Sequence, residues 1–320
     1  MRIKIFAVAI ILALLPVVTA AKGKCDRTCL ESYVDRYLDA MKDHKVDPEL
    51  FAKKVIFTEN GVRLPFGSEG LWHSMVGRGT YKFYVPDVET QQVAFIGTVK
   101  EGGSRGGDPT TVAFALRLKI VNKLITEVEQ LAIRPEQSLF GGGGSGGGAG
   151  GGGGGFGNTG DNVEKMGAPN EIFTQVIPEA ERASREELIK TANYYFSGLQ
   201  RWDGKGVYPY TDDCVRFENG MMASPDVKKQ FTDGSLKNMG VSRIRDRRFV
   251  AVDRERGIVF AFAFFDHLSI NWTWQLAELF KIENGKIRRV EAIFHKCPYG
   301  TNSGWSTYEQ GISEEYRSIK

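Results

Sequence analysis

The chain states one short phrase twice, and this repetition limits the folds open to it more than any other feature. The phrase "VIFTENG" at residues 55–61 returns as "VRFENG" at residues 215–220, and each copy follows an amphipathic helix at the same distance. Further on, "LKIVNKLITEVEQLAI" from Leu118 aligns without a gap with "FKIENGKIRRVEAIFH" from Phe280. Two separated matches in the same order indicate an internal duplication. We therefore predict two similar folding units, which also suits a length of 320 residues.

A run of glycines separates the two copies. Residues 141–155 read "GGGGSGGGAGGGGGG", a stretch with no side chains to bury and maximal backbone freedom. The flanking segments are polar and irregular, so we predict a Gly-rich flexible linker over residues 135–178. A glycine-rich phosphate loop is the alternative, but no Lys-Ser or Lys-Thr pair follows the run and no strand precedes it.

Within each copy, helical periodicity comes first and a series of strands follows, which is the order of an α+β fold. The first copy predicts a helix over 29–43 with one apolar stripe, and the second predicts a helix over 184–202. The other predicted elements are a short helix at 48–54, a helical turn at 68–75 and strands at 55–64, 79–88, 91–101, 111–120 and 124–134, and in the second copy a helix within 224–238 and strands at 214–223, 244–253, 257–267, 272–282 and 286–294.

The N-terminus has the pattern of a secretory leader. A basic start with Arg2 and Lys4 precedes an apolar run over 5–15, and Pro16 is followed by small residues at the spacing that signal peptidase prefers. We therefore predict a signal peptide at residues 1–20 and a secreted protein, periplasmic or extracellular. A membrane anchor is the alternative, but the run is shorter than the roughly 20 residues that span a bilayer.

Charge and motifs exclude several classes of function. The formal net charge of +3 would fall by two without Arg2 and Lys4, so no basic field remains to recruit nucleic acid or, after leader removal, an anionic membrane. The sequence contains no Gly-x-Ser-x-Gly, no His-Glu-x-x-His and no dinucleotide fingerprint. Serine hydrolases, zinc proteases and nicotinamide enzymes are therefore disfavoured, and we expect no cofactor and no metal.

Four cysteines, Cys25, Cys29, Cys214 and Cys297, form an even set that secretion would place in an oxidising compartment. Two disulfides are then possible, in any of three connectivities. A Cys25–Cys29 bond within a helix would be poorly aimed, so we expect bridges from the first helix to Cys214 or Cys297. A metal site is the alternative, but no Cys-x-x-Cys pair or His cluster supports it.

The order of elements resembles the cone of nuclear-transport-factor-2-like proteins, and within them the SnoaL-like branch. The resemblance rests on "ESYVDRYLDAM" leading into "VIFTENG", on "GLW", on "VAFIGTVKE", and on the closing "KIRRVEAIF" with its "CPYGTNSGW" tail. The chain is most similar to secreted SnoaL-like proteins of bacteria and fungi, here as a tandem. The resemblance implies SnoaL-like domains at 25–134 and 179–306 that pack side by side as such domains dimerise, and a C-terminal tail at 307–320.

The resemblance also implies what each domain encloses: helices and a curved antiparallel sheet surround an apolar pocket. Members of the wider superfamily include isomerases, polyketide cyclases, epoxide hydrolases, lyases and non-catalytic binding modules. In such a pocket an isolated carboxylate or His among apolar walls acquires a shifted pKa and can act as an acid or base. Three functions stay open: acid–base catalysis on a hydrophobic small molecule, binding of an apolar ligand, and a structural protein whose pockets are filled by side chains.

In the second copy the candidate bases are Asp266, His267 and His295. Asp266 and His267 end an apolar strand and alternate in direction, so one of them would face the pocket mouth; a turn with a solvated His is the alternative. His295 stands where the first copy has Ile133, and it is either a catalytic residue or a partly exposed His beside the tail. Aromatic residues suited to a planar ligand are also found in this copy: Tyr208, Tyr210, Trp272, Trp274 and Tyr299.

In the first copy the candidates surround the segment "SEGLWH". The resemblance places this turn near the pocket entrance, so His73 is a candidate base, and Trp72 and Tyr84 are candidate ligand contacts. Glu59 and Glu218 recur within the repeated phrase. We interpret both as turn residues on the wet side, because Asn-Gly tolerates positive φ; a buried Glu facing a pocket is the alternative.

Overall fold

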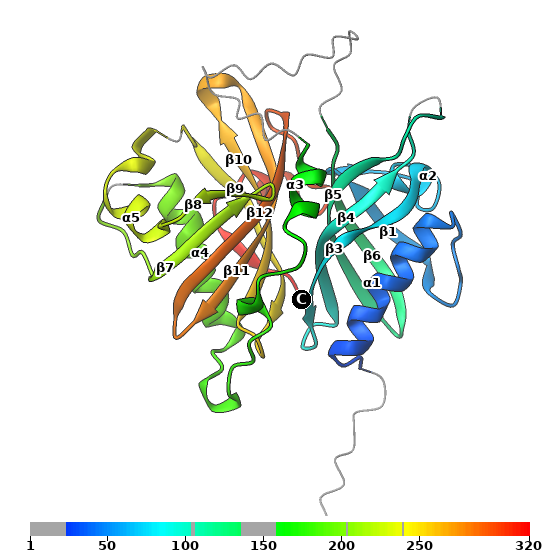
Figure 1. Cartoon of the computed structure of the whole chain (residues 1–320), viewed down its shortest axis with the longest axis horizontal. Helices are drawn as coiled ribbons and strands as arrows, with labels where there is room; N and C mark the ends of the chain where they lie inside the picture. The colour runs from blue at the N-terminus through cyan, green and yellow to red at the C-terminus, as the bar shows by residue number, and fades with distance from the viewer. Residues whose placement is uncertain (1–23, 104–105, 136–157, 203, 239) are drawn as a thin grey trace, which may run out of the picture.

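The computed structural model describes residues 24–103, 106–135, 158–202, 204–238 and 240–320. The predicted leader and the glycine run lie outside the described residues. The described chain is an α+β protein with two mixed sheets of six and seven strands (Figure 1). We call the six-stranded sheet A and the seven-stranded sheet B.

Sheet A and its helices form the first half of the molecule. Its elements are α1 (Arg27–Lys42), β1 (Phe51–Glu59), β2 (Val62–Arg63), α2 (Leu71–Ser74), β3 (Met75–Asp87), β4 (Gln92–Glu101), β5 (Thr110–Val121) and β6 (Leu124–Ile133). The strand order is β2-β1-β6-β5-β4-β3, with β1 parallel to β6 and the other pairs antiparallel. The prediction of a short helix at 48–54 is wrong, because Phe51 already pairs with Ile125 of β6 and starts a strand.

Sheet B and its helices form the second half. Its elements are α4 (Arg185–Gln200), β7 (Tyr210–Glu218), β8 (Met221–Ser224), α5 (Val227–Thr232), β9 (Arg243–Asp253), β10 (Ile258–His267), β11 (Trp272–Glu283), β12 (Lys286–Pro298) and β13 (Tyr316–Ser318), with short 3-10 turns at Glu179–Glu181, Ser235–Asn238 and Leu268–Ile270. The order β8-β7-β12-β11-β10-β9 repeats that of sheet A, and β13 adds an edge strand beside β9. The duplication predicted from the sequence is therefore present in the topology.

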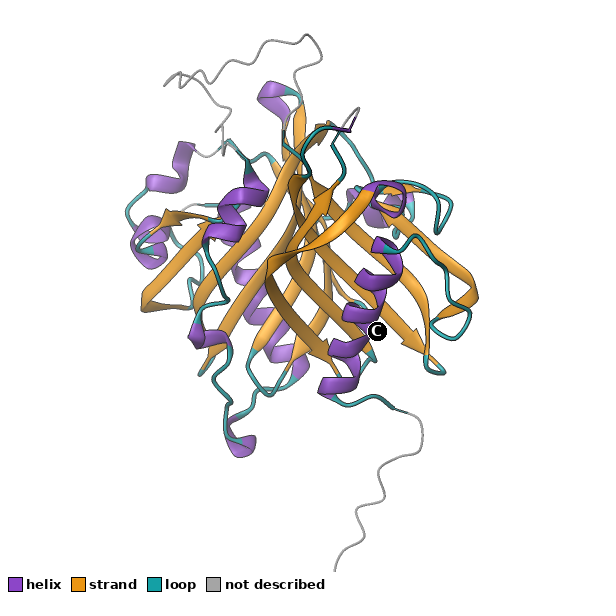
Figure 2. Ribbon diagram, turned by 45° about the vertical axis from the view of Figure 1, so that its right-hand side comes forward, coloured by secondary structure: helices purple, strands orange, loops and turns teal. Residues whose placement is uncertain are grey.

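The two sheets pack face to face, and each half's long helix lies on the far side of its own sheet (Figures 1 and 2). We call the face of each sheet that its own helix covers the inner face, and the face turned toward the other sheet the shared face. Because side chains alternate along a strand, each strand contributes residues to both faces. On β5, Phe114 and Leu116 belong to the inner core, and Ala113 and Ala115 belong to the shared core. The protein therefore has three apolar cores, one inside each half and one between them.

Local sequence explains where the long helices begin. The side chain of Asp26 accepts a hydrogen bond from the Cys29 amide at 2.9 Å and caps α1. Ser184 and Glu187 form a reciprocal capping box at the start of α4. The predicted apolar stripe of α1 is buried against sheet A: Leu30, Tyr33, Val34, Tyr37, Leu38 and Met41.

The repeated phrase forms the same turn in both halves. Asn60 and Asn219 have φ values of 50° and 51°, and a glycine with positive φ follows each of them. Each Asn side chain bonds the backbone of the last long strand: Asn60 Nδ2 donates to Ala132 O at 3.0 Å, and Asn219 Nδ2 donates to Phe294 O at 3.2 Å. The turn prediction is confirmed. The expectation that the preceding Glu lies on the wet side is wrong for Glu59, which is 6% exposed.

Two reciprocal ion pairs join the halves. Arg27, the first residue of α1, reaches Asp253 at the end of β9 with an Nη2–Oδ1 distance of 2.7 Å. Arg185, the first residue of α4, pairs with Asp87 at the end of β3. Each half thus binds the other through equivalent positions, as the two subunits of a symmetric dimer do. A further buried pair crosses the shared face, where Arg248 binds Glu129 through two nitrogens at 2.8 and 2.6 Å.

The segment between the halves is more ordered than the sequence predicts. Residues from 158 onward form α3 (Thr159–Lys165) and a 3-10 turn at Glu171–Phe173, so the irregular linker predicted through 178 is wrong for this part. Val163 and Phe173 are buried in the shared core, which explains the order. The predicted tail likewise folds back: after α6 (Tyr308–Ile312), β13 pairs with β9, and Trp305 Nε1 donates to Thr58 Oγ1 of sheet A at 2.7 Å.

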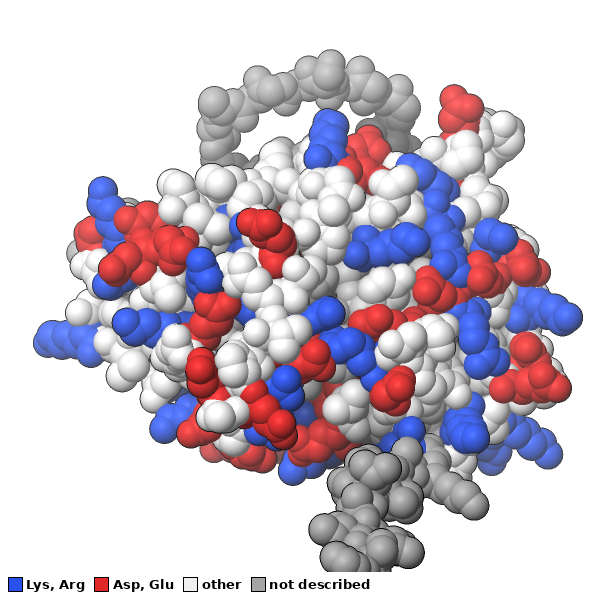
Figure 3. All heavy atoms as spheres, turned by 60° about the horizontal axis from the view of Figure 1, so that its bottom comes forward, with Lys and Arg blue, Asp and Glu red and all other residues white. Residues whose placement is uncertain are grey.

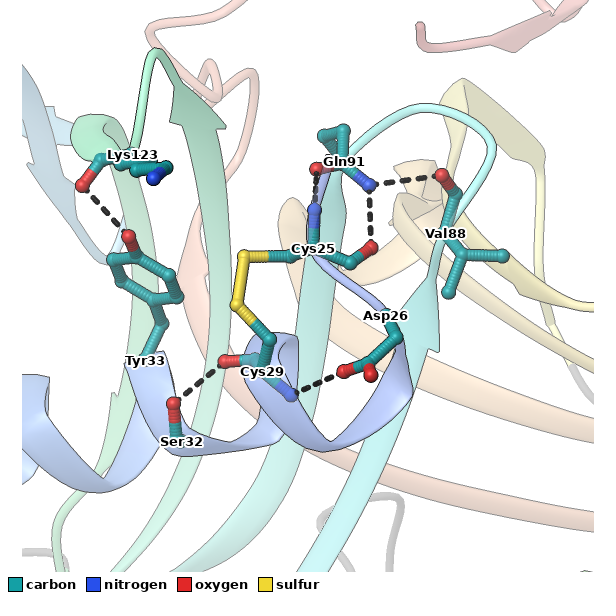
Figure 4. The surroundings of a disulfide bond; sticks show 8 residues. All are labelled: Cys25, Asp26, Cys29, Ser32, Tyr33, Val88, Gln91 and Lys123. Atoms are coloured by element: carbon teal, nitrogen blue, oxygen red, sulfur yellow. Dashed lines mark hydrogen bonds between the residues drawn. A yellow bond between two sulfur atoms is a disulfide. The ribbon is translucent and has the colours of Figure 1, made fainter. Parts of the chain in front are cut away.

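The expected disulfide pattern is wrong. Cys25 and Cys29 are bonded to each other at the start of α1 (Figure 4). Cys214 and Cys297 are free thiols. Cys25 precedes the N-cap Asp26 and lies outside the helix, so the bond does not run between two helical turns. Cys214 lies on β7 inside the second half, and burial raises the pKa of its thiol to about 12. Gln91 holds the disulfide's first residue through hydrogen bonds to both the amide and the carbonyl of Cys25.

Candidate functional site

The inner face of sheet B gathers polar side chains inside an apolar core. Glu278 lies on β11 between Leu276 and Phe280, both members of that core. Arg216 and Glu218 lie on β7, two residues apart and hence on one face. We call this group the inner cluster, and its five members are Tyr195 of α4, Tyr210, Arg216, Glu218 and Glu278.

Glu278 is the unusual member of the inner cluster. Its residue is 2% exposed, and burial, followed by the nearby charge of Glu218, raises the pKa of its carboxyl to about 8 against the opposing effect of Arg216. The neighbouring Tyr195 hydroxyl acts in the opposite direction and favours the ionised form of this carboxyl. Its Oε2 atom is buried and has no hydrogen-bond partner in the described part of the chain. At neutral pH the group is therefore predominantly a neutral acid with one oxygen available.

Arg216 holds the cluster together. Its Nη1 donates to the Tyr195 hydroxyl at 3.3 Å, and its Nε lies 3.1 Å from Glu218 Oε1. Burial opposes the charge of Arg216, but the neighbouring Tyr195 and Glu218 outweigh it and raise the guanidinium pKa. The Glu218 side chain is 19% exposed, so the cluster runs from a fully buried carboxyl to one that reaches solvent.

On the α5 side, Phe231 packs against two tyrosines of the inner cluster and against Tyr208. The Phe231 ring lies 4.8 Å from Tyr210, 5.5 Å from Tyr208 and 5.7 Å from Tyr195, measured between centroids. The hydroxyls of Tyr208 and Tyr210 are buried without a hydrogen-bond partner among the described residues. Both tyrosines were predicted as ligand contacts, and the structure brings them together around Phe231, with Tyr210 close enough to Glu278 for the charge of that carboxyl to act on it.

The corresponding interior of the first half is closed by paired groups. Trp72 Nε1 donates to Tyr37 OH at 3.0 Å, and Tyr37 OH donates to Gln130 Oε1 at 2.7 Å. Gln130 Nε2 then donates to Glu59 Oε2 at 2.7 Å, and Arg134 Nη2 lies 2.9 Å from Glu59 Oε1. The predicted ligand contact Trp72 is thus 1% exposed, and its indole nitrogen is already bonded.

The other first-half candidates point elsewhere. His73 is exposed on α2, on the side opposite to buried Trp72. Tyr84 is half-buried and its hydroxyl donates to Asp35 Oδ1 at 3.0 Å; burial and that carboxylate raise its pKa. Neither residue lies in the Trp72 network.

Asp266 is fully occupied by cations and a hydroxyl. Its Oδ2 accepts from Arg243 at 2.6 Å and Arg245 at 2.8 Å, and Thr273 Oγ1 donates to its Oδ1 at 2.7 Å. Burial alone would raise the pKa of Asp266, but these hydrogen bonds outweigh burial and lower it. The carboxylate is held ionised, which suits a structural anchor better than a base that exchanges protons near neutrality.

His267 faces the opposite side, as strand alternation predicts, and joins two predicted tryptophans. Its ring lies 4.3 Å from Trp274 and 6.3 Å from Trp272. Nδ1 contacts Phe265 O at 3.1 Å, burial lowers the imidazole pKa, and Nε2 lacks a partner within the described residues. This aromatic group lies at the β10–β11 turn, where Lys296 Nζ stands 3.7 Å from the Trp272 ring.

His295 lies between the halves and not in a pocket of the second half. Its Nε2 contacts the Gln275 amide at 3.2 Å, and burial, assisted by Arg134 of the first half, lowers its pKa to about 4. Tyr299 is 37% exposed in the tail that follows β12. The structure therefore divides the predicted second-half site among the α5 side of sheet B, the β10–β11 turn and the contact between halves.

Sequence reasoning missed the residues that carry the inner cluster: Tyr195, Arg216 and Glu278. The internal alignment held the signal, because Glu278 replaces Leu116 of the first copy and Arg216 replaces Phe57. The structure confirms these equivalences: Phe57 pairs with Val128, and Arg216 pairs with the matching Val290. A charged residue in place of an apolar one at a core position marks a departure from plain packing.

Three further observations on the described residues limit the kinds of site that they can form. No three His, Cys, Asp or Glu side chains among them are grouped so as to hold a metal ion. None of the described helices combines the length and apolar character needed to cross a bilayer. On the molecular face drawn in Figure 3, acidic and basic side chains are intermixed rather than gathered by sign.

Comparisons with known proteins bear mainly on the second half. Residues 181–294, which include the whole inner cluster, match the family described as "Domain of unknown function (DUF8021)". No curated protein matches the chain. Among solved structures, the chain is similar to a de novo designed protein with a curved β-sheet, at 19% identity over 35% of this chain and 88% of that chain with a TM-score of 0.27. It is also similar to an LEH-like epoxide hydrolase of M. tuberculosis, at 17% identity over 34% of this chain and 84% of that one with a TM-score of 0.29.

Proposed function

We propose that the second half is a cofactor-independent acid–base site for a small hydrophobic molecule, with Glu278 as the group that exchanges the proton. The observation that carries this proposal is the buried Glu278 carboxyl, which has a pKa near 8 and one oxygen without a partner in the described chain. A carboxyl in this condition donates and accepts protons near neutral pH, because neither form is strongly favoured. A purely structural carboxyl would be expected to have both oxygens bonded, as Glu59 has in the first half.

The neighbours of Glu278 suit two related reactions. In hydration of a strained ring ether, Glu278 donates its proton to the ring oxygen, water adds to the carbon, and the proton lost by water returns to the carboxylate. In a proton shift beside a carbonyl, the carboxylate removes a proton from carbon and returns it at another carbon. In both, the hydroxyls of Tyr208 and Tyr210 donate hydrogen bonds to the oxygen that gains negative charge. Arg216 keeps Tyr195 and Glu218 in place around the carboxyl.

The proposal is tested with two probes, styrene oxide for hydration and 3-cyclohexen-1-one for the proton shift. In a Glu278→Gln variant we expect turnover to fall by about 100-fold or more, since positioned acid–base groups contribute 10²–10⁴-fold. The matched control is Glu291→Gln, which alters a buried carboxyl on the shared face, held by Arg289 at 2.6 Å. Equal turnover of wild type and Glu278→Gln would overturn the catalytic proposal. If the proteins bind the probes but none of them turns the probes over, the result supports a second candidate function, a binding protein that uses the same tyrosine hydroxyls.

We further propose that each half is a SnoaL-type cone of the nuclear-transport-factor-2-like class, and that the chain acts outside the cytoplasm. The first proposal is supported by the repeated order of a helix, a strand, a helical turn and three or more long strands, with the helix on one sheet face. The second is supported by the leader-like N-terminus and by the Cys25–Cys29 disulfide. Expression of the full chain followed by fractionation checks localisation: recovery of uncleaved protein in the cytoplasm contradicts it.

A further inference from the structure

The ring of Phe231 packs against two tyrosines whose hydroxyls are buried without a hydrogen-bond partner among the described residues. Phe231 is fully buried, and its ring centroid lies 4.8 Å from that of Tyr210 and 5.5 Å from that of Tyr208. A phenylalanine ring offers these hydroxyls no hydrogen-bond acceptor in its plane. Buried hydroxyls normally have partners, so two of them around one ring indicate that a different occupant supplies an acceptor.

Phe231 is carried by a shorter element than Tyr195 or Tyr210. Tyr195 belongs to the 16-residue helix α4 and Tyr210 to a strand paired with β12, whereas α5 has six residues. The backbone of Phe231 is tied by one side-chain bond, from Trp202 Nε1 to its carbonyl at 2.6 Å. In the first half, Trp72 of the short helix α2 fills the interior, and its indole bonds Tyr37. Phe231 has no such polar anchor, so a small movement of α5 can withdraw its ring.

The neighbouring helix leaves no room for a larger rearrangement inward. A Cβ added to Gly198 of α4 would lie 2.6 Å from Phe231 Cε1 and 3.2 Å from Tyr208 Cε1. Phe231 and Tyr208 therefore pack directly against α4 at Gly198, where a side chain would displace them. Glu278 lies close enough to Tyr210 for its charge to act on that tyrosine.

We infer that the Phe231 ring holds the place of a ligand's aromatic ring, and that this site takes a small aromatic molecule bearing an acceptor oxygen, such as an aryl ketone or aryl epoxide. The inference rests on the proposed function, whose site it deepens with a ligand class. The ligand's ring replaces that of Phe231, its oxygen accepts from Tyr208 and Tyr210, and its reacting atom faces Glu278. Wild-type affinity is lowered because Phe231 competes for the same space.

The test compares acetophenone with α-methylstyrene, which has the same shape but CH₂ in place of the carbonyl oxygen. Dissociation constants are measured by ligand-detected NMR for the full chain, for Phe231→Ala, for Phe231→Ala with Tyr210→Phe, and for Phe114→Ala. Phe114→Ala opens comparable apolar space in the core of the first half, where it lies fully buried. We expect Phe231→Ala to bind acetophenone about 10-fold more tightly than wild type does. We also expect this variant to bind acetophenone about fivefold more tightly than it binds α-methylstyrene, which is the preference that one or two hydrogen bonds give. The Tyr210→Phe change reduces the preference, and Phe114→Ala shows none.

Equal or stronger binding of α-methylstyrene by Phe231→Ala would mean an apolar cavity only and would overturn the inference. Should the alanine variant fail to fold, Phe231→Leu gives the same comparison with less space removed. Binding is also measured in Glu278→Gln. If the preference for acetophenone is preserved but no protein turns over the probes, the proposed function is contradicted and this inference stands. If turnover depends on Glu278 but the preference is absent, this inference is contradicted and the proposed function stands.

Discussion

The two halves share one topology but fill their interiors in opposite ways. In the first half, every polar group of the chain Trp72, Tyr37, Gln130 and Glu59 has a partner, and the surrounding rings lie within 4.8 to 6.1 Å of one another. In the second half, the inner cluster leaves a carboxyl oxygen and two nearby hydroxyls unpartnered among the described residues. The two copies share one scaffold, so the difference lies in the side chains of the interior and not in the topology, and it is consistent with the function that we propose for the second half.

The difference also shows what the second half gives up in stability. Polar groups with incomplete hydrogen bonding inside an apolar core cost about 1–3 kcal/mol each. A structural duplicate would be expected to replace them with apolar residues, as Phe57 and Leu116 do at the equivalent positions of the first half. The retained polar cluster therefore favours a function in the second half and a supporting role for the first.

The largest expected effect comes from converting the second interior toward the first. Arg216→Phe alone leaves the Glu218 carboxylate without its cation and removes the charge that lowers the pKa of Glu278, and we expect a loss of about 3–5 kcal/mol in the free energy of unfolding. The double change Arg216→Phe with Glu278→Leu installs the first-half residues and removes the guanidinium together with the buried acid. We expect it to unfold at about the wild-type free energy or up to about 4 kcal/mol above it, with no turnover.

Urea unfolding of the three proteins measures this effect. Because the double variant adds only Glu278→Leu to the single variant, their difference isolates the effect of the buried Glu278 carboxyl from the effect of losing Arg216. The comparison between halves fails if the double variant is as unstable as Arg216→Phe, since the polar cluster would then be needed for folding itself.

A smaller effect is expected from the two ion pairs that join the halves. They occupy equivalent positions, and both carboxylates are buried, but the arginines differ: the Arg185 side chain is 2% exposed and the Arg27 side chain is 19% exposed. We expect Arg185→Met to lower the unfolding free energy by about 3 kcal/mol, because it leaves Asp87 unpaired away from solvent, and Arg27→Met by about 1 kcal/mol or less, because solvent can take the place of the partly exposed Arg27 beside Asp253. Urea denaturation at low and high salt checks both; equal losses would show that the two contacts are energetically symmetric despite their different burial.

The sequence predicts the duplicated scaffold well because that information is local and repeated. The α+β order, the α1 stripe and the Asn-Gly turns at residues 60 and 219 follow from periodicity and backbone preferences. The start of β1 at Phe51 does not, since it depends on pairing with β6, which is distant in sequence. The order of α3 also escapes local reasoning, because Val163 is buried by a core that both halves build together.

The site is less predictable because its residues are ordinary when read one at a time. Glu278 stands within the apolar strand "WTWQLAELF", where a lone Glu resembles an exposed position of an amphipathic strand. Only the alignment with Leu116 and the position of Arg216 on β7 reveal that it faces inward. His295 shows the reverse error: its contrast with Ile133 is real, but the side chain faces the contact between halves.

The smallest effect is a pH dependence of stability that Glu278 gives to the second half. Glu278 titrates near pH 8 when folded and near 4.3 when unfolded, so between these values the folded state holds a proton that the unfolded state has released. Its contribution therefore declines as pH rises through this window and is lost above about pH 8, by at most about 1.4 kcal/mol per pH unit. His295, whose folded pKa is near 4, changes stability only below about pH 6.5 and therefore does not contribute between pH 6.5 and 8. Unfolding free energies measured across this interval should fall more steeply for wild type than for Glu278→Gln. Identical slopes would mean that Glu278 is ionised in the folded protein, and the contrast between the two interiors would then be one of shape rather than of proton chemistry.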